Sequence, residues 1–201
     1  VSFQVACLCI GDELLDGRLA DTNSQRLASL LFDLGIGLGS TCIVVDSLDE
    51  ISEAISHLAE RFDIIVTSGG LGPTSDDLTA EGIALANAED VSLNVEAWAH
   101  IKNRFAKRGL PLPDNNRRQA EVPKSSRIVL NEAGVAPAFV TQVGKAEVWS
   151  FPGVPSEFNY FLSEHLRPYI ENKQQRGMTT QLFQGTIRCL GLTESSLAQR
   201  L

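Results

Sequence analysis

The chain has 201 residues, of which 43% are hydrophobic and 21% are charged. This indicates a globular protein with one domain of ordinary size and an appendage. The formal net charge is −8 and no basic run exceeds a pair such as Arg117-Arg118, which argues against a nucleic acid as partner, because nucleic acids bind basic surfaces. No apolar run is long enough to span a membrane and no basic segment opens the chain, so we expect a cytoplasmic protein without a membrane partner.

The first third of the chain alternates strand and helix patterns. An apolar, β-favouring run at Val1–Ile10 precedes leucines at helical spacing, at positions 27, 30, 31 and 34. Further strands are predicted at Thr41–Val45 and Asp63–Ser68, and the helix between them opens with the capping box Ser47-x-x-Glu50. Strand–helix–strand–helix–strand order predicts a parallel sheet with right-handed crossovers.

The glycine run Gly35-Ile36-Gly37-Leu38-Gly39 has the composition of a dinucleotide-binding loop but not its context. Such a loop follows a strand and opens a helix. This run follows a helix and opens a strand, so we interpret it as a helix C-cap and a short turn.

The second half is less regular. Asn94 is predicted to cap a helix, and a Pro/Asn-rich stretch, Leu110–Pro123, follows it. Strands are expected at Arg127–Asn131, Ala138–Val143 and Ala146–Phe151, the last two joined by a hairpin turn at residues 144–145.

The C-terminal part begins with a rigid turn, Pro152-Gly153-Val154-Pro155-Ser156, that opens another helix. The polar segment Glu171–Met178 is predicted to be a linker. A strand-like run near Leu182–Cys189 and a helix start at Thr193-Glu194-Ser195-Ser196 follow it. We therefore expect one domain over residues 1–170, then a linker and the start of a small further domain over residues 171–201.

The cysteines and histidines show no ligand spacing. Cys7 and Cys9 share one face of the first strand, while Cys42 and Cys189 lie in other apolar runs. All four are predicted to be buried thiols rather than a disulfide or zinc set. The histidines, at positions 57, 100 and 165, fall in separate helical patterns and are expected at surface or partly buried positions.

The segment Ser68-Gly69-Gly70-Leu71-Gly72-Pro73-Thr74-Ser75-Asp76-Asp77-Leu78-Thr79 leaves a strand and precedes a helix. Glycines let the backbone turn sharply and approach a ligand, and their amides with a helix start can seat a phosphate. A P-loop would add a lysine there. Two aspartates stand there instead, which favours phosphate chemistry with a bridging divalent metal. The alternative is a Gly-Pro turn in which Asp76 or Asp77 caps the helix.

Acidic residues also follow the first strand, at Asp12 and Glu13. Carboxyl ends of parallel strands meet at one edge of the sheet, where α/β folds bind ligands. We therefore expect these two residues to converge with Asp76 and Asp77 beside the glycine loop, supplying the hard oxygen ligands that Mg²⁺ prefers.

Several motifs together resemble the molybdopterin-binding (MoaB/MogA-like) domain, and within it the N-terminal domain of the CinA competence/damage-inducible family. The similarity covers about residues 1–170. It is carried by these segments: Gly11-Asp12-Glu13-Leu14-Leu15, Asp21-Thr22-Asn23-Ser24, Gly69-Gly70-Leu71-Gly72-Pro73-Thr74 with Asp76-Asp77-x-Thr79, Asn116 with Gln119-Ala120, Asn131-x-x-Gly134-x-Ala136-Pro137, and Pro152-Gly153-Val154-Pro155-Ser156-Glu157.

The resemblance implies an α/β fold in three α/β/α layers around a mostly parallel sheet. It also implies metal-dependent pyrophosphatase activity on ADP-ribose-like nucleotides, or on FAD as in relatives that accompany FAD synthetase. Asp77 matches an aspartate that is essential in relatives. Val135 and Ala138 depart from the usual Thr and Gly, so a contact near Asn131–Pro137 is expected to differ.

The site expected from residues and resemblance together divides by role. Glycine amides and the Thr74 hydroxyl would bind the diphosphate, and Asp77 with Asp76 would be catalytic. The metal, Mg²⁺, Mn²⁺ or Co²⁺, would bind Asp77, Asp76 and Glu13, and a monovalent cation is a further candidate. The substrate-binding set is Gly69, Gly70, Gly72, Thr74, Asn23, Asn131 and Ser156.

Three function classes remain open at this point. The first is a hydrolase that cleaves a phosphoanhydride bond of a small nucleotide. The second is a pterin-handling enzyme of molybdenum-cofactor synthesis, disfavoured because the loop has Leu71 where those relatives usually carry Thr. The third is a nucleotide-binding module without turnover. We also expect a homo-oligomer.

Overall fold

The computed structural model describes residues 3–176, 190–191 and 193–199. Its centre is a six-stranded sheet in the order β2-β1-β3-β8-β7-β6. The first four strands in this order are parallel, and β7 runs antiparallel to both of its neighbours. The mostly parallel sheet is thus confirmed. Its strands are β1 (Val5–Ile10), β2 (Leu38–Val44), β3 (Ile64–Ser68), β6 (Arg127–Val129), β7 (Ala138–Val143) and β8 (Ala146–Phe151).

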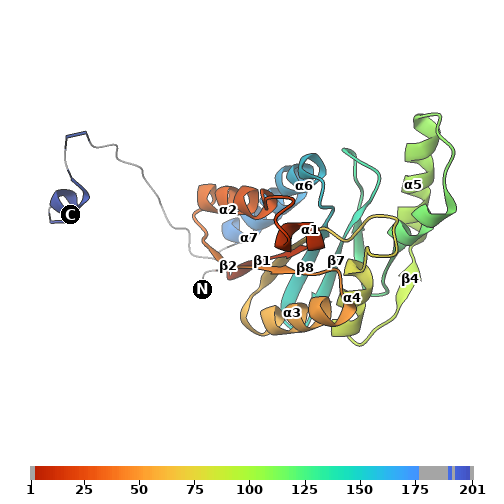
Figure 1. The fold of residues 1–201 in the computed structure, drawn as a ribbon, viewed down its shortest axis with the longest axis horizontal. Coiled ribbons are helices and arrows are strands. Elements are labelled where there is room, and N and C mark those ends of the chain that lie inside the picture. The colour runs from red at the N-terminus through yellow and green to blue at the C-terminus, as the bar shows by residue number, and fades with distance from the viewer. Residues whose placement is uncertain (1–2, 177–189, 192, 200–201) are drawn as a thin grey trace.

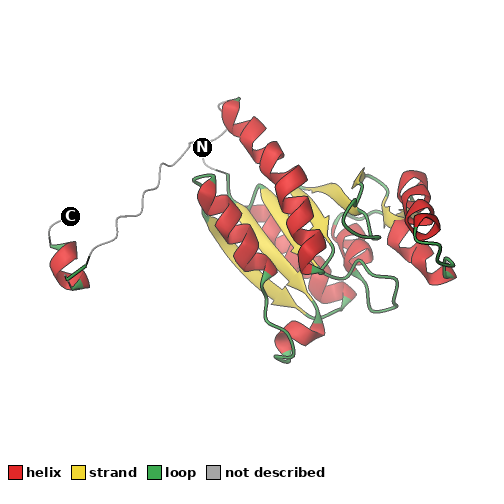
Figure 2. Cartoon of the chain, turned by 90° about the horizontal axis from the view of Figure 1, so that it is seen from above, coloured by secondary structure: helices red, strands yellow, loops and turns green. Residues whose placement is uncertain are grey.

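Helices cover both faces of the sheet, which gives the expected three layers (Figure 1). One face carries α2 (Asn23–Asp33), α6 (Pro155–Phe161) and α7 (Arg167–Gln175), with a π-helical turn, η2, at Leu162–Leu166. The other face carries α3 (Leu48–Arg61) and α4 (Thr79–Ala86). Because both faces are covered, β1 and β3 are buried along their whole length. Figure 2 shows the helices of one layer lying over the sheet, roughly along the direction of its strands.

A small lobe projects beyond the sheet, at the right of Figure 1. It consists of α5 (Val95–Lys107), the 3₁₀ helix η1 (Asp114–Ala120) and the antiparallel strands β4 (Val91–Leu93) and β5 (Glu121–Pro123). It has its own core around Ala97, Ile101 and Ala120. The Asn94 cap is confirmed, since its side chain accepts from Ala97 N at 3.0 Å. The helical and strand parts of Leu110–Pro123 were not predicted, because a Pro/Asn-rich sequence carries no periodic signal.

The glycine run after α2 ends the helix, as interpreted from its context. Gly35 has φ +70°, its amide donates to Phe32 O at 3.0 Å, and the amide of Ile36 donates to Leu31 O at 2.8 Å. This pair of bonds is a Schellman motif. The strand that follows, β2, begins at Leu38 rather than at Thr41.

Two local predictions were wrong. Ser47 is the N-cap of α3, but its side chain makes no capping hydrogen bond, so the capping box does not form; its carbonyl instead accepts from the amide of Ile51 at 3.0 Å. The predicted linker is helical as far as Gln175. That helix is held to the domain because Ile170 is fully buried and Gln174 Nε2 donates to Leu34 O at 2.8 Å.

Further along, the predicted helix start at Thr193 is confirmed: α8 spans Glu194–Ala198, and Thr193 Oγ1 accepts from Ser196 N at 3.3 Å. The strand-like run at 182–189 lies outside the described residues.

The prediction of buried thiols is confirmed for Cys7 and Cys9 but is wrong for Cys42. Cys7 and Cys9 are buried and their sulfurs are 3.8 Å apart on one face of β1. Cys42 is half-buried and Cys189 lies outside the described residues. His57 is exposed and His165 is half-buried, whereas His100 is buried.

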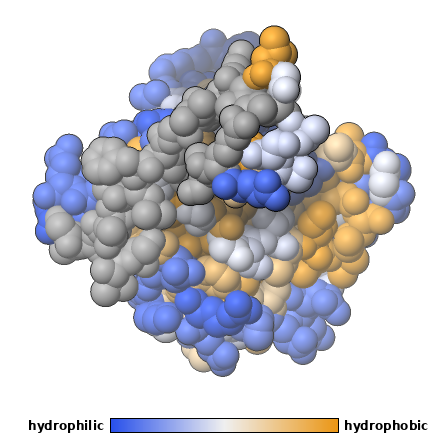
Figure 3. All heavy atoms as spheres, turned by 90° about the vertical axis from the view of Figure 1, so that its left-hand side faces the viewer, coloured by the Kyte–Doolittle hydropathy of each residue, from blue (hydrophilic) through white to orange (hydrophobic). Residues whose placement is uncertain are grey.

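The β2 edge of the molecule carries a mixed surface. Figure 3 shows this side, where hydrophilic atoms cover much of the outline and hydrophobic atoms gather toward the right. Ile43 and Val45 at this edge are 36% and 37% exposed. Across the described ranges, no helix has the length and apolar character needed to cross a membrane. The homo-oligomer stays a prediction.

Candidate functional site

A pocket of about 930 Å³ lies at the carboxyl ends of the parallel strands. Its lining includes Ile10 and Gly11 at the end of β1, Ser68 and Gly69 at the end of β3, and Pro152 after β8. From β1 the chain passes outward to β2 and then returns to β3 on the other side. The pocket therefore occupies the topological switch point, where open α/β sheets bind ligands.

The glycine loop forms one wall, and the hydrogen bonds of its amides differ from those expected. The Gly69 amide donates to Phe151 O at 3.2 Å, and the Gly72 amide donates to Asp77 Oδ1 at 2.6 Å. Within the described part of the chain, the amides of Gly70 and Leu71 have no acceptor. The amides of Gly70 and Leu71 are therefore available to an anion. Of the three glycine amides that were predicted to bind phosphate, those of Gly69 and Gly72 are already engaged within the protein.

Asp77 shapes this loop. Besides Gly72, its carboxylate accepts from the Thr74 amide at 2.9 Å and from the Thr74 hydroxyl at 2.6 Å. The helix-cap alternative was wrong, because α4 begins at Thr79 with Leu78 as N-cap and no side-chain cap. From the lobe, Arg118 Nε donates to the Asp77 carbonyl at 3.0 Å and Gln119 Nε2 donates to the Leu71 carbonyl at 3.2 Å.

Both glycines at the start of the loop are required by close contacts. A Cβ at Gly69, where φ is +108°, would lie 2.2 Å from Ile10 O. A Cβ at Gly70, where φ is +63°, would lie 2.2 Å from Thr79 Oγ1, whose hydroxyl donates to Gly69 O at 2.8 Å. The loop, β1 and the start of α4 thus form one closely packed unit.

Acidic side chains converge on the pocket, as the strand order predicts. Glu13, Asp76 and Asp77 line it, and Asp46, which sequence reasoning missed, lines it too. Asp12 pairs reciprocally with Asp46: each carboxylate accepts from the other residue's amide at 3.2 Å. Asp46 follows β2 at the same edge, so the rule that indicated Asp12 and Glu13 could also have found it.

The electrostatics of Asp46 show how closely these acids approach one another. Burial raises the pKa of Asp46 above its ordinary value. The negative charges of Asp12, Glu13 and Asp76 raise this pKa further. Within the described ranges, however, no group of three or more His, Cys, Asp or Glu side chains is arranged to hold a metal ion. The predicted set of Asp77, Asp76 and Glu13 is therefore not a preformed three-ligand site.

The remaining predicted residues divide between the pocket and its framework. Asn23 lines the pocket, and its Nδ2 donates to Ser68 Oγ and to Gly153 O, both at 2.8 Å. Thr74, Asn131 and Ser156 are not among the residues that line the pocket.

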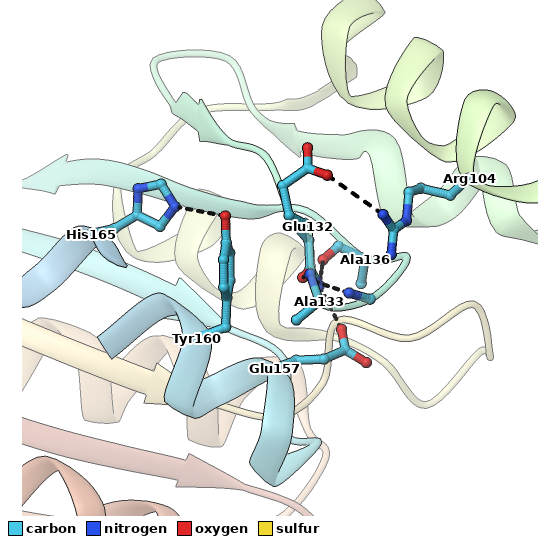
Figure 4. Close-up of polar contacts among 9 residues, drawn as sticks. Arg104, Glu132, Ala133, Ala136, Glu157, Tyr160 and His165 are labelled. Atoms are coloured by element: carbon cyan, nitrogen blue, oxygen red, sulfur yellow. Dashed lines mark hydrogen bonds and ion pairs between the residues drawn. The ribbon is translucent and has the colours of Figure 1, made fainter. Parts of the chain in front are cut away.

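Asn131 is fully buried and belongs to the framework of the site. Its Oδ1 accepts from the amides of Ala133 and Gly134, at 3.0 and 2.7 Å. Its Nδ2 donates to Ala136 O at 2.8 Å and to Glu157 Oε2 at 2.5 Å (Figure 4). With both side-chain hydrogens and the oxygen engaged, Asn131 orders a loop and a carboxylate and has no free group for a ligand.

Two charged residues of the pocket were not predicted to have a role there. Glu157, in the first turn of α6, lines the pocket, and burial raises its pKa. Arg108, at the end of α5, also lines it. Of the two departures from the family pattern, Val135 lines the pocket whereas Ala138 is buried in β7.

Comparison with known proteins identifies relatives of this architecture. A family described as "Probable molybdopterin binding domain" matches residues 6–172. A CinA-like protein from Citrifermentans bemidjiense is 38% identical over 98% of this chain and 47% of its own length. A CinA-like protein from Anaeromyxobacter sp. strain Fw109-5 is 38% identical over 83% of this chain and 40% of its own length. The chain thus spans about half the length of the curated relatives it matches.

Solved structures agree with this assignment. CinA from Thermoplasma acidophilum, described as having unknown function, superposes with a TM-score of 0.77 at 33% identity, over 83% of this chain and 98% of that one. MoaB from Pyrococcus furiosus, described as a tungsten cofactor synthesizing protein, gives a TM-score of 0.52 at 17% identity, over 88% and 95%, which shows the fold alone. The chain belongs to the molybdopterin-binding-like domain family and, within it, to the CinA-like proteins.

Proposed function

We propose that this domain hydrolyses the phosphoanhydride bond of a nucleotide diphosphate, such as ADP-ribose or FAD, in a reaction that depends on a divalent metal ion. Water would attack one phosphorus, the bond from that phosphorus to the bridging oxygen would break, and two phosphate monoesters would leave. One observation carries the proposal: free backbone amides and a cluster of acids share a single pocket at the switch point of the sheet.

The amides account for phosphate binding. The N–H groups of Gly70 and Leu71 have no acceptor within the described part of the protein, and backbone amides in a tight glycine turn bind anions well. Asp77 acts here as a positioning residue, because its carboxylate fixes the turn that exposes these two amides.

The acids fit a divalent cation. The negative charges of its acidic neighbours already repel the Asp46 carboxylate and raise its pKa. A diphosphate that entered the pocket without a cation would add to this repulsion. Mg²⁺ commonly binds through one or two carboxylates, with water and substrate phosphates completing its shell. Glu13 and Asp76 would hold the ion, which would neutralise charge that develops on phosphate oxygens.

A screen of metals against substrates tests the proposal. ADP-ribose, FAD, NAD and ATP are each incubated with Mg²⁺, Mn²⁺ or Co²⁺, with and without K⁺, and the products are separated by chromatography. We expect monoester products from at least one dinucleotide, and their loss in Glu13→Gln/Asp76→Asn. The matched control is Glu50→Gln/Asp49→Asn, which changes exposed acids of α3.

Two alternatives give different results in the same screen. Tight nucleotide binding without any product favours a binding module. A pterin-handling enzyme would bind molybdopterin in preference to every nucleotide. Molybdopterin is included because MoaB from Pyrococcus furiosus has a similar fold.

A further inference from the structure

The acids that line the pocket stand in two different electrostatic surroundings. The negative charges of Asp12, Glu13 and Asp76 act on Asp46. The charges that act on Glu157 are instead the positive ones of Arg108 and Arg104. Glu157 is therefore separate from the acids assigned to the metal, and its carboxylate requires a different role.

Glu157 is held in place by dedicated contacts. Asn131 donates to its Oε2 at 2.5 Å while the other polar atoms of Asn131 bind the adjoining loop. A Cβ on Gly134 would lie 2.0 Å from Glu157 Oε2, so a side chain there would displace the carboxylate from its present position. Figure 4 shows Glu157 on its helix, below Ala133 and Ala136 of this loop. A wholly buried asparagine with every side-chain group engaged fixes one side of this carboxylate.

The second oxygen of Glu157 is available to a ligand. Oε1 receives no hydrogen bond from any described residue. A carboxylate oxygen in a half-buried pocket accepts hydrogen bonds, and it cannot donate while ionised. Arg108 also lines the pocket and makes no ion pair with any residue in the described ranges. A ligand group that suits Glu157 and Arg108 has hydroxyls that donate to the carboxylate and oxygens that accept from the guanidinium.

We propose that Glu157 accepts hydrogen bonds from the vicinal hydroxyls of a ribose in the bound nucleotide, with Asn131 as its positioning residue. The inference rests on the proposed function, because it takes a nucleotide as the ligand. A ribose joined to the diphosphate presents adjacent hydroxyls, and a carboxylate is a common partner of ribose hydroxyls in nucleotide sites. Glu157 and Arg108 thus select for the sugar, while Glu13 and Asp76 act at the phosphates.

Direct binding of three ligands tests the inference: ADP-ribose and two analogues, each lacking the vicinal hydroxyls on one of its riboses. Dissociation constants are measured by calorimetry with Ca²⁺, another divalent ion that binds oxygen ligands, in place of Mg²⁺, and on a time scale over which chromatography detects no product. The proteins compared are the wild type, Glu157→Gln, Glu157→Ala and the control Glu164→Gln, an exposed acid on η2. Melting temperatures show whether each variant is folded.

We expect Glu157→Ala to weaken ADP-ribose binding about 10-fold or more, the scale of a hydrogen bond to a charged group, and Glu157→Gln to weaken it less. The analogue that lacks the hydroxyls bound by Glu157 should bind the wild type about as weakly as ADP-ribose binds Glu157→Ala. Its affinity should be the same for the wild type and the Glu157 variants. Equal losses for all three ligands, or unchanged affinity in both variants, would overturn the inference.

Binding and turnover separate this inference from the proposed function. Discrimination among the ligands without hydrolysis supports the role of Glu157 and contradicts the hydrolase. Hydrolysis by the wild type, together with unchanged affinity in the Glu157 variants, supports the hydrolase and contradicts the role of Glu157. Failure of the wild type to bind any of the three ligands contradicts both.

Discussion

The amide of Gly72 donates a 2.6 Å hydrogen bond to the carboxylate of Asp77, five residues further along the chain. The Thr74 amide and hydroxyl donate to the other oxygen of the same carboxylate. The loop is thus closed by the side chain that was predicted to face the substrate. As a consequence, the amides that remain free are those of Gly70 and Leu71.

Asp77→Asn should destabilise this loop and lower kcat by about 10²-fold, the scale of a lost positioned group. A carboxamide has a single oxygen, so it cannot accept from the part-buried Gly72 amide and from the exposed Thr74 amide at the same time. A donor that is left unpaired costs about 1–3 kcal/mol when it is buried from water. Melting temperature and kcat are measured beside the control Asp114→Asn, an exposed residue of η1. A normal melting temperature with lost kcat would instead assign Asp77 a direct role at the metal or the water.

The fold could be predicted from sequence where its signals are local. Apolar runs located β7 and β8 to the residue, and the order of strands and helices indicated the parallel part of the sheet. The helical end of α7 could not be predicted, because residues 171–175 are polar and their helix depends on contacts of Ile170 and Gln174 with the domain.

The site could be predicted in position but not in detail. The rule that parallel strands end at one edge placed Glu13 and Asp76 in the same pocket. The rule does not say which side chains turn back onto their own backbone. Asp77 and Asn131 both do so, and each was predicted to contact the ligand. Glu157 was assigned only a place at a helix start, although the geometry places it in the pocket wall.

Gly70→Ala should cost more stability than Gly17→Ala. Both glycines have positive φ, +63° and +79°. A Cβ at Gly17 has open space, whereas at Gly70 it would meet the Thr79 side chain at 2.2 Å. The control therefore shows the backbone cost alone, on the order of 1 kcal/mol, and any excess in urea unfolding measures the clash. Equal losses would show that the loop moves to accept a side chain.

Relief of that clash provides a second comparison. In Gly70→Ala/Thr79→Ala the new methyl group no longer meets the Thr79 hydroxyl, so the two losses should not add. Strict additivity in a double-mutant cycle would mean that the two side chains do not meet.

Asn23→Ala should loosen the junction between the loops that follow β3 and β8. The buried side-chain amide of Asn23 donates to Ser68 Oγ and to Gly153 O. Its removal leaves the buried Ser68 oxygen without this donor, at a cost of about 1–3 kcal/mol. The control is Asn172→Ala, an exposed position on α7. Equal unfolding midpoints for the two variants would mean that the bridge contributes nothing to stability.

Glu157 should make stability fall as pH rises. Burial raises its pKa in the folded protein above the ordinary value of 4.5, so the folded state binds the proton more tightly than the unfolded chain does. This contribution is fully present below pH 4.5 and is lost as pH rises through the folded pKa. Urea unfolding from pH 4.5 to 8 should therefore show a smaller decline for Glu157→Gln than for the wild type. Parallel curves would contradict the shift.

The most direct measurement of the central claim follows the ³¹P signals of ADP-ribose during incubation with the protein and Mg²⁺. The diphosphate resonances should be replaced by those of two monoesters, AMP and ribose 5-phosphate. Excess EDTA should abolish the conversion, and restored Mg²⁺ should recover it, because the acids around Asp46 repel a diphosphate without a cation. Conversion that continues at full rate in excess EDTA, or diphosphate signals that persist with every metal although the nucleotide binds, would contradict the account.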